Sequence, residues 1–228
     1  MCNSIEGIAF DLDGTLYPNY RLNIRLFSFL LKEWRLLSAF GNVRKVIRKE
    51  QAEGKLANGD FYDHQAEKLS QILPFETGVL KNKVDALIYR GWEPLFKKIR
   101  LFKNVKETLV SLKNSCFKMG LLSDFPPETK IKYLGIDDIW DTVLCSEICG
   151  AIKPHPLSFE KLSHAMSLPC EKILYVGNSR PYDVAGAAAA GMKTAWIKNP
   201  FFPGSGIKEP KPDFSFHNYR QLYNFMIK

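Results

Sequence analysis

The chain has 228 residues, of which 46% are hydrophobic and 25% are charged, as expected for a globular protein that buries a substantial core. It has no run of about 18 apolar residues, and its first residues lack a basic region followed by an apolar core. We therefore expect neither a membrane span nor a secretory signal, and the expected location is the cytoplasm. The net charge of +8 leaves polyanions open as partners.

The first predicted element is a buried strand that ends in two carboxylates. The apolar run Ile8–Phe10 leads directly into Asp11 and Asp13, and Gly14 and Thr15 follow. In an open α/β sheet the catalytic crevice lies beyond the carboxyl ends of the strands. Residues two apart on an extended segment face the same way, so both carboxylates are expected to converge on one small substrate. One can attack phosphorus while the other protonates the leaving oxygen. The structural alternative is an Asx-type turn after the strand.

The interval that follows the first strand interrupts the strand pattern, because its apolar residues recur at helical spacing. We predict an all-helical cap domain over residues 18–98, inserted into an α/β core made of residues 1–17 and 99–228. A turn between cap helices is expected at 54–59, where two glycines lie close together.

Four further apolar runs are predicted strands, each ending in polar residues: Phe117–Leu122, Thr142–Cys145, Ile173–Val176 and Thr194–Ile197. Helical segments are predicted over 105–113, 127–134, 157–167 and 182–190. Strands that alternate with helices predict a parallel, doubly wound, Rossmann-like α/β sheet. Residues 199–212 are rich in Pro and Gly and are predicted to form a surface loop.

Polar residues after three of these strands fit a phosphate site with a metal. The hydroxyl of Ser123 and the N–H that follows it can bind a phosphate oxygen, although a lone serine there is also a common turn residue. Lys153 can neutralise a phosphoryl group and the attacking carboxylate together, and the alternative is a solvated surface lysine. Asp183 can hold Mg²⁺ opposite Asp11, or it simply begins a helix, where the macrodipole favours an acid.

In chain order, the segments DLDGT (from Asp11), LLSD (to Asp124), IKP (around Lys153) and VGNSRPYD (to Asp183) resemble the haloacid dehalogenase superfamily of phosphohydrolases. The resemblance covers nearly the whole chain, and the helical insert resembles the family's first type of cap. Taken together the four motifs are highly specific, whereas only the first is strong alone.

The resemblance implies a role for each motif residue. Asp11 would be the nucleophile and Asp13 the general acid and base, with Lys153 steadying the aspartyl-phosphate. The phosphate would be bound by Ser123, Asp124 and Lys153. The implied cofactor is Mg²⁺, held by Asp11, the backbone carbonyl of Asp13, Asn178 and Asp183.

One position departs from the family pattern. The fourth motif usually carries Asp where this chain has Asn178, and an amide oxygen is a ligand for hard cations that brings no charge. The metal site is therefore expected to be less negative here. The dehalogenating members lack the second carboxylate of the first motif, so the presence of Asp13 favours chemistry at phosphorus.

These observations predict a Mg²⁺-dependent phosphomonoesterase that hydrolyses a small phosphorylated metabolite through an aspartyl-phosphate. The alternatives are a phosphomutase of the same superfamily and a non-catalytic protein that binds polyanions through its basic cap. From Arg21 to Lys55 there are nine basic residues and three acids. The basic residues are interleaved with apolar ones at helical spacing, and Phe29, Trp34 and Phe40 are expected to pack in a core, so nucleic acid is not an expected partner.

Cap residues are expected to decide the substrate, and those nearest to the site in the sequence are Tyr17, Tyr20, Arg21 and Arg25. The four histidines show no metal-ligand spacing, and His155 is expected to be a supporting or surface residue. Among the five cysteines, Cys116 and Cys145 lie in strand-like runs and are expected to be buried, reduced thiols. Cys145 and Cys149 are not expected to bind metal. Nothing in the sequence indicates an oligomeric state.

Overall fold

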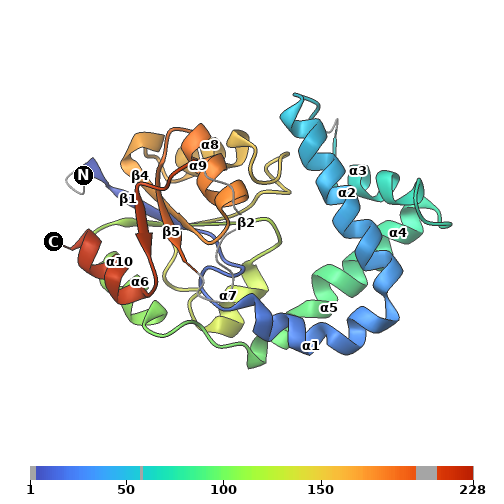
Figure 1. Ribbon diagram of the computed structural model, residues 1–228, viewed down its shortest axis with the longest axis horizontal. Helices are drawn as coiled ribbons and strands as arrows, with labels where there is room; N and C mark the ends of the chain where they lie inside the picture. Colours follow the sequence, from blue (N-terminus) through green and yellow to red (C-terminus); the bar gives the residue numbers. More distant parts are fainter. Residues whose placement is uncertain (1–3, 57–58, 199–209, 228) are drawn as a thin grey trace.

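The computed structural model describes residues 4–56, 59–198 and 210–227 (Figure 1). Its centre is a parallel sheet with the strand order β3-β2-β1-β4-β5-β6. The strands are β1 Gly7–Phe10, β2 Lys118–Ser123, β3 Thr142–Cys145, β4 Ile173–Gly177, β5 Lys193–Ile197 and β6 Phe214–Phe216. The predicted parallel, doubly wound α/β sheet is therefore confirmed, with β6 as a strand that the sequence patterns did not reveal.

Strand β1 occupies the centre of the sheet because it is apolar throughout and buried at every position. It pairs with β2 on one side and with β4 on the other, and Phe10 lies opposite both Leu121 and Val176. The chain builds outward from β1 to β3 and then returns to start the other half at β4. Ligands of such sheets bind where the strand order reverses, which here is beyond the ends of β1, β2 and β4.

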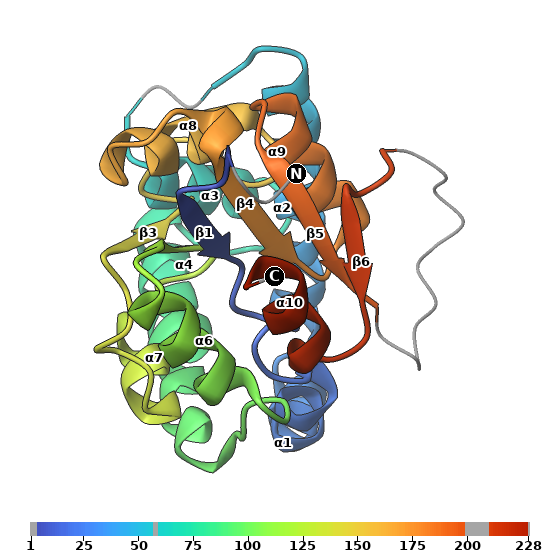
Figure 2. The same cartoon turned by 90° about the vertical axis from the view of Figure 1, so that its left-hand side faces the viewer.

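Helices lie on both sides of the sheet, as Figure 2 shows. Ile8 and Phe10 belong to a core that includes residues of α6 (Val105–Asn114), α7 (Glu128–Leu134) and α10 (Tyr219–Met226). Ala9 points to the opposite face, toward α8 (Pro156–Ala165) and α9 (Ala185–Ala189). The remaining short turns of this part are η4 (Cys170–Lys172) and η5 (Arg180–Val184). Both faces of the sheet are therefore covered, and its chemistry is confined to the strand ends.

The described elements between β1 and α6 are all helical and lie to one side of the sheet (Figure 1). They are α1 Asn19–Lys32, α2 Trp34–Ala52, α3 Phe61–Ser70, α4 Thr77–Val84, η2 Asp85–Tyr89, α5 Arg90–Trp92 and η3 Glu93–Lys98. Buried residues of α2, α3 and α4 form a separate small core, which also includes Ile152 from the sheet side. We call residues 18–98 the helical insert.

The exposed fractions of the aromatic side chains test the expectation that they pack in a core. Phe40 is 5% exposed and packs in the core of the helical insert, whereas Trp34 is 61% exposed, so the expectation that Trp34 is a core residue is wrong. Trp34 begins α2, where its ring faces solvent and the Arg35 guanidinium. The side chains of Phe29 and Arg25 and most of the expected surface loop at 199–212 lie outside the described residues. Within the described ranges, no helix has both the length and the apolar character that a membrane span needs.

Candidate active site

The loop after β1 turns sharply at the carboxyl edge of the sheet. The Asp11 N–H donates to the Val176 carbonyl (2.9 Å), which extends the strand pairing by one residue. Gly14 then adopts a φ of +91°, a conformation that favours glycine. A Cβ atom there would lie 2.5 Å from Nδ2 of Asn178, so the tight turn and the close approach both require glycine. This turn brings the first motif, DLDGT, into contact with Asn178 of the fourth motif, VGNSRPYD.

The Asp11 carboxylate lies at the centre of a buried charge cluster. Its Oδ1 accepts from Nζ of Lys153 (2.6 Å) and its Oδ2 accepts from Oγ1 of Thr15 (2.6 Å). The same Lys153 Nζ lies 2.7 Å from Oδ1 of Asp183. Asp11, Lys153 and Asp183 are respectively 5%, 3% and 2% exposed. The surface-lysine alternative for Lys153 is therefore excluded by burial.

The carboxylates of Asp11 and Asp183 share the ammonium of Lys153, and this arrangement shifts the pKa values of Asp11 and Lys153. Burial is the main cause that raises the pKa of Asp11 to about 7, and the neighbouring charge of Asp183 raises it further, against the lowering effect of Lys153. Although burial alone would lower it, the pKa of Lys153 is raised well above its ordinary value by Asp11 and Asp183. Lys153 therefore stays protonated, and the cluster carries excess negative charge.

Asp13 lies in the same loop as Asp11, but its carboxylate has different hydrogen-bond donors. Its carboxylate accepts from Nζ of Lys130 at 3.0 and 2.9 Å, from the Tyr17 hydroxyl, and from Oγ of Ser123 at 3.3 Å. The charge of Asp13 also raises the pKa of Asp11, which shows that the two carboxylates lie near each other. The environments differ, because Asp13 is 24% exposed at its side chain and Asp11 only 7%. Such a pair suits two different acid–base roles.

Of the two residues at the end of β2, Ser123 faces Asp13, whereas the Asp124 carboxylate binds neighbouring loop residues. Ser123 is fully buried, and its Oγ accepts from the Phe125 N–H (3.2 Å) while facing Asp13. The Asp124 carboxylate points away from this position and accepts from the Ser146 hydroxyl (2.5 Å) and the Lys153 N–H (3.1 Å). The predicted role of Asp124 in phosphate binding therefore depends on its backbone N–H.

Asp183 and Asn178 approach the catalytic loop from the end of β4. The Asp183 Oδ2 accepts from the Ser179 N–H (2.9 Å), and a Cβ at Gly177 would lie 2.3 Å from the Cβ of Asp183. Glycine at position 177 thus lets Asp183 press against the strand end. The Asn178 Oδ1 lies 3.3 Å from Oγ1 of Thr15, so this amide is next to the residue that donates to Asp11.

These groups form an incomplete but suitable donor set for a hard cation. Among the described residues, no three His, Cys, Asp or Glu side chains are grouped as a ready metal cluster. The two buried carboxylates of Asp11 and Asp183 would supply the charge for such a cation, and the predicted neutral ligands are the Asn178 amide and the Asp13 carbonyl. The excess negative charge around Lys153 is the observation that fits a cation here.

Helix α2 of the insert docks on the core through two arginines that were not singled out in the sequence. Arg44 forms a buried ion pair with Glu147 and lies 3.4 Å from Oδ2 of Asp124. Arg48 donates to Oδ2 of Asp124 (2.8 Å) and to the Lys153 carbonyl (2.8 Å). Burial raises the pKa of Asp124, but Lys153, Arg44 and Arg48 outweigh it and hold the value at about 2. The basic face of α2 is therefore partly consumed in ion pairs with the core.

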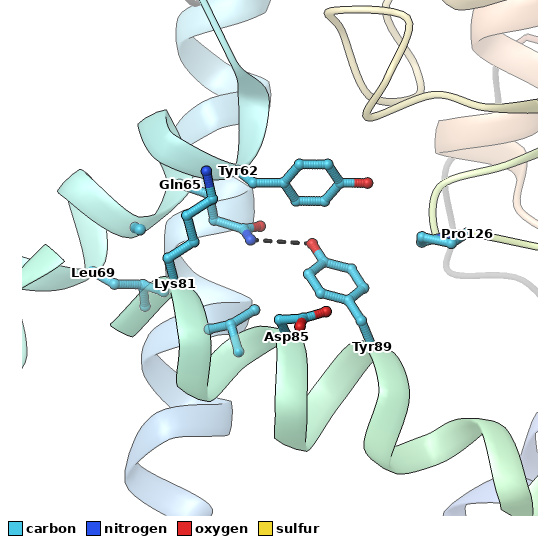
Figure 3. Close-up of a pocket in the computed structure, with 9 residues that line it drawn as sticks. Tyr62, Gln65, Leu69, Lys81, Asp85, Tyr89 and Pro126 are labelled. Atoms are coloured by element: carbon cyan, nitrogen blue, oxygen red, sulfur yellow. Dashed lines mark hydrogen bonds between the residues drawn. The ribbon is translucent and has the colours of Figure 1, made fainter. Parts of the chain in front are cut away.

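A cavity of about 190 Å³ lies between the insert and the core (Figure 3). The Tyr62 ring extends toward Pro126 of the core, whereas the Tyr89 hydroxyl points toward Gln65 and accepts from its amide (3.1 Å). Tyr89 in turn donates to Glu147 (3.0 Å), which links the cavity wall to the Arg44 ion pair. The cavity therefore lies beside the loop that follows Ser123, to which Pro126 belongs.

The other predicted residues have varied positions. Tyr17 is buried against Asp13, whereas Tyr20 and Arg21 line a second cavity of about 300 Å³ beside Gly14. His155 accepts from the Leu157 N–H (3.2 Å) and so caps α8, as expected of a supporting residue.

The four described cysteines are free thiols. Cys145 and Cys149 are buried, and burial raises the pKa of both thiols. Cys116 is exposed, so its expected burial is wrong. It has a φ of +64° and precedes β2 in a turn, where no strand neighbour covers it. Cys2 lies outside the described residues.

Lys130, Tyr17 and the Arg44–Glu147 pair are the site residues whose contacts the sequence did not indicate. Lys130 lies in the run ETKIKYL, where it alternates with Ile131 and Lys132 like any lysine of a surface helix. Its 8% exposure becomes evident only when α7 is placed beside the loop after β1. The contact of Lys130 with Asp13 is therefore evident from the three-dimensional structure and not from the sequence.

Comparisons with known proteins agree with this geometry. The family model described as haloacid dehalogenase-like hydrolase matches residues 5–191. The phosphoglycolate phosphatase of Haemophilus influenzae is 28% identical over 96% of this chain and 97% of its own length. The glyceraldehyde 3-phosphate phosphatase of Pyrococcus furiosus is 27% identical over 85% of this chain and 81% of its own length. The structure of L-2-haloacid dehalogenase from Xanthobacter autotrophicus aligns over 98% of both chains, with a TM-score of 0.68 and 17% identity.

Proposed function

Because the chain belongs to the haloacid dehalogenase-like hydrolase family, we propose that it is a Mg²⁺-dependent phosphomonoesterase that acts on a small phosphorylated metabolite. The observation that carries the proposal is the buried cluster in which Nζ of Lys153 bridges the Asp11 and Asp183 carboxylates. The phosphatase names of the curated relatives support an enzyme that hydrolyses phosphoric monoesters. The cytoplasmic location stays a prediction.

In the first half-reaction, an oxygen of the Asp11 carboxylate attacks phosphorus in line with the ester bond. The new O–P bond gives an aspartyl-phosphate, and the bond to the leaving oxygen breaks. Asp13 gives its proton to that oxygen, so an alcohol departs. The Ser123 hydroxyl, the Asp124 N–H and the Lys153 ammonium bind the phosphoryl oxygens and stabilise their charge.

In the second half-reaction, the Asp13 carboxylate takes a proton from water, and the resulting nucleophile attacks the same phosphorus. The bond to Asp11 breaks, which restores its carboxylate and releases inorganic phosphate. The separate environments of the two aspartates support this division, because Asp11 is enclosed by Lys153 and Thr15 whereas Asp13 is partly open to solvent.

Mg²⁺ would be held by the carboxylates of Asp11 and Asp183, the carbonyl of Asp13 and the amide of Asn178. When bound, it supplies positive charge that offsets the repulsion between the nucleophilic carboxylate and the phosphoryl group. The fit rests on the two buried carboxylates that share a single ammonium.

The helical insert would act as the cap of this enzyme. Its arginines Arg44 and Arg48 contact the core at Asp124 and Glu147, directly beside the end of β2. If the cap closes on the core through these ion pairs, it would shield the phosphoryl group from water before transfer. Opening of the cap would then admit the water that hydrolyses the aspartyl-phosphate. The same ion pairs argue against the insert as a polyanion-binding surface, because two of its basic residues are already neutralised.

The test is a panel of phosphorylated metabolites and an aryl phosphate, assayed for phosphate release with Mg²⁺ and with a chelator. We expect turnover that requires Mg²⁺ and that Asp11→Asn abolishes. The matched control is Asp137→Asn, an exposed position outside the site, which should keep full activity. Full activity in Asp11→Asn would refute the mechanism. Conversion of a sugar phosphate to its isomer, without net phosphate release, would indicate a phosphomutase instead.

A further inference from the structure

A cavity of about 300 Å³ lies where the helical insert joins the core, and the proposed mechanism does not use it. The chain enters the insert at Pro18 and has returned to the core at Leu101, and both residues line the cavity. Phe102, which also lines it, donates its N–H to the Leu16 carbonyl (2.9 Å), so the two chain crossings are joined here. Ile197, at the end of β5, belongs to the wall on the core side. A molecule bound in this cavity would therefore contact both crossings and the core.

Among the described residues, every charged side chain that lines this cavity is basic. Arg21 lies in the first turn of α1, Lys103 precedes α6, and Lys198 directly follows β5. His217 also lines the cavity and offers an imidazole N–H donor. Within the same ranges none of the three cations has an ion pair, and Nε of Arg21 donates to the Tyr20 hydroxyl (3.4 Å). Cations that gather without a counterion repel one another, so the cavity favours a bound anion.

The cavity is close to the candidate active site but separate from it. Its described lining residues include none of the side chains proposed to attack phosphorus, to bind the phosphate or to hold the metal. Gly14 of the loop after β1 lines it, as does Tyr219, whose hydroxyl donates to the Thr15 carbonyl. The Thr15 hydroxyl in turn donates to Asp11. The cavity therefore contacts the loop that carries the proposed nucleophile without containing the nucleophile itself.

The size and the wall of the cavity define the class of anion. A volume of about 300 Å³ suits a small molecule and not a polymer. Leu101, Phe102 and Ile197 form an apolar part of the wall, and the Tyr20 ring, 46% exposed, adds an aromatic surface. Three cations from separate segments match a dianion better than a group of single charge. A phosphate monoester with a small apolar group combines these properties.

We propose that this cavity is an effector site that binds a small organic phosphate dianion through Arg21, Lys103 and Lys198. The bound ligand links the insert to the core, because Arg21 belongs to the insert whereas Lys103 and Lys198 belong to the core. It therefore slows the opening that admits water for the second half-reaction, and kcat falls. This consequence for kcat rests on the proposed phosphatase function, whereas the binding itself does not.

The probe for the experiment is phenylphosphonate, an apolar ring on a phosphonate whose C–P bond the proposed reaction does not hydrolyse. Its affinity is measured by calorimetric titration at mildly alkaline pH, where the phosphonate is doubly ionised, and with a chelator, so that no metal attracts it to the active site. The natural protein is compared with the double variant Lys103→Glu/Lys198→Glu and with Ser123→Ala. Lys132→Glu, at an exposed lysine of α7, is the matched control. Methylphosphonate tests the apolar wall, and far-UV circular dichroism checks folding.

We expect one phenylphosphonate to bind per chain, with an affinity at least tenfold weaker in the double variant because two attractive charges become repulsive. Ser123→Ala and Lys132→Glu should stay within about twofold of the natural protein, and methylphosphonate should bind at least fivefold more weakly than phenylphosphonate. With Mg²⁺ and an aryl phosphate, phenylphosphonate should lower kcat, extrapolated to saturating substrate, at least twofold in the natural protein and not in the double variant.

Four results would overturn the proposal. They are equal affinity in the natural protein and the double variant, equal affinity for the two phosphonates, loss of binding in Ser123→Ala, which would place the anion in the active site, and an unchanged kcat when phenylphosphonate is bound. Where the double variant does not fold, the single variant Lys103→Glu at an exposed position replaces it. Failure of the phosphatase function is distinct, because the aryl phosphate would then not be hydrolysed while the titration would still report binding.

Discussion

Replacing Asp124 by Asn should measure how strongly the charges between the helical insert and the core stabilise the fold. Lys153, Arg44 and Arg48 outweigh the effect of burial and lower the pKa of Asp124 from its ordinary value of 3.8 to about 2. A difference of that size between the folded and unfolded states corresponds to about 2.5 kcal/mol of stability at neutral pH. The Asn side chain keeps the shape of Asp124 but loses this contribution.

The sign of the pH dependence follows from the lowered pKa of Asp124. The folded protein holds the carboxylate ionised more strongly than the unfolded chain does, so the stabilisation is fully present above about pH 4. It is lost as the pH falls from about 4 toward 2, with roughly half gone near pH 3.

Urea unfolding of the natural protein and Asp124→Asn at pH 6 and pH 3 provides the measurement. The free energies of unfolding should differ by about 2.5 kcal/mol at pH 6 and by about half of that at pH 3. The exposed control Asp137→Asn should show no comparable difference at either pH. A difference that stays the same at both pH values would refute the electrostatic reasoning.

Three further outcomes are expected. Gly177→Ala should lower the free energy of unfolding by about 1–3 kcal/mol in urea titrations, because its Cβ would lie 2.3 Å from Asp183; an unchanged value would show that Asp183 moves freely. Arg44→Met should cost about 3–5 kcal/mol by the same measurement, since it leaves Glu147 buried without its partner, and adding Glu147→Leu should recover much of the loss. Asn178→Asp should tighten Mg²⁺ binding in calorimetric titration, and unchanged affinity would place Asn178 away from the metal.

The sheet was predictable because its signals are local. Each of the first five strands is an apolar run bounded by polar turn residues, and each predicted strand end lies within one residue of the observed end. The motif residues Asp11, Lys153 and Asp183 lie at three different strand ends, and parallel topology brings such ends together. Strand β6 has only three residues, FSF, which is too short for an alternating pattern to be distinguished from a loop.

The contacts between the insert and the core, and the contact of Lys130 with Asp13, were not predictable, since they join residues far apart in the chain. Arg44 and Glu147 are 103 residues apart, and Lys130 and Asp13 are 117 apart. In the sequence, Arg44, Glu147 and Lys130 each resemble a charge on a solvated helix or turn. Trp34 shows the converse, because a large aromatic residue in an apolar pattern is expected to be buried, yet the start of α2 leaves it open.

The last helix has a consequence for how the protein is made. Tyr219 is fully buried and its hydroxyl donates to the Thr15 carbonyl (2.7 Å), and the Thr15 hydroxyl in turn donates to the Asp11 carboxylate. During synthesis, the ribosome must therefore add more than two hundred residues after the first motif before that motif acquires its final support. A nascent chain that ends between Asp183 and Tyr219 would carry all four motifs and still lack the hydrogen bond that Tyr219 donates to the loop after β1.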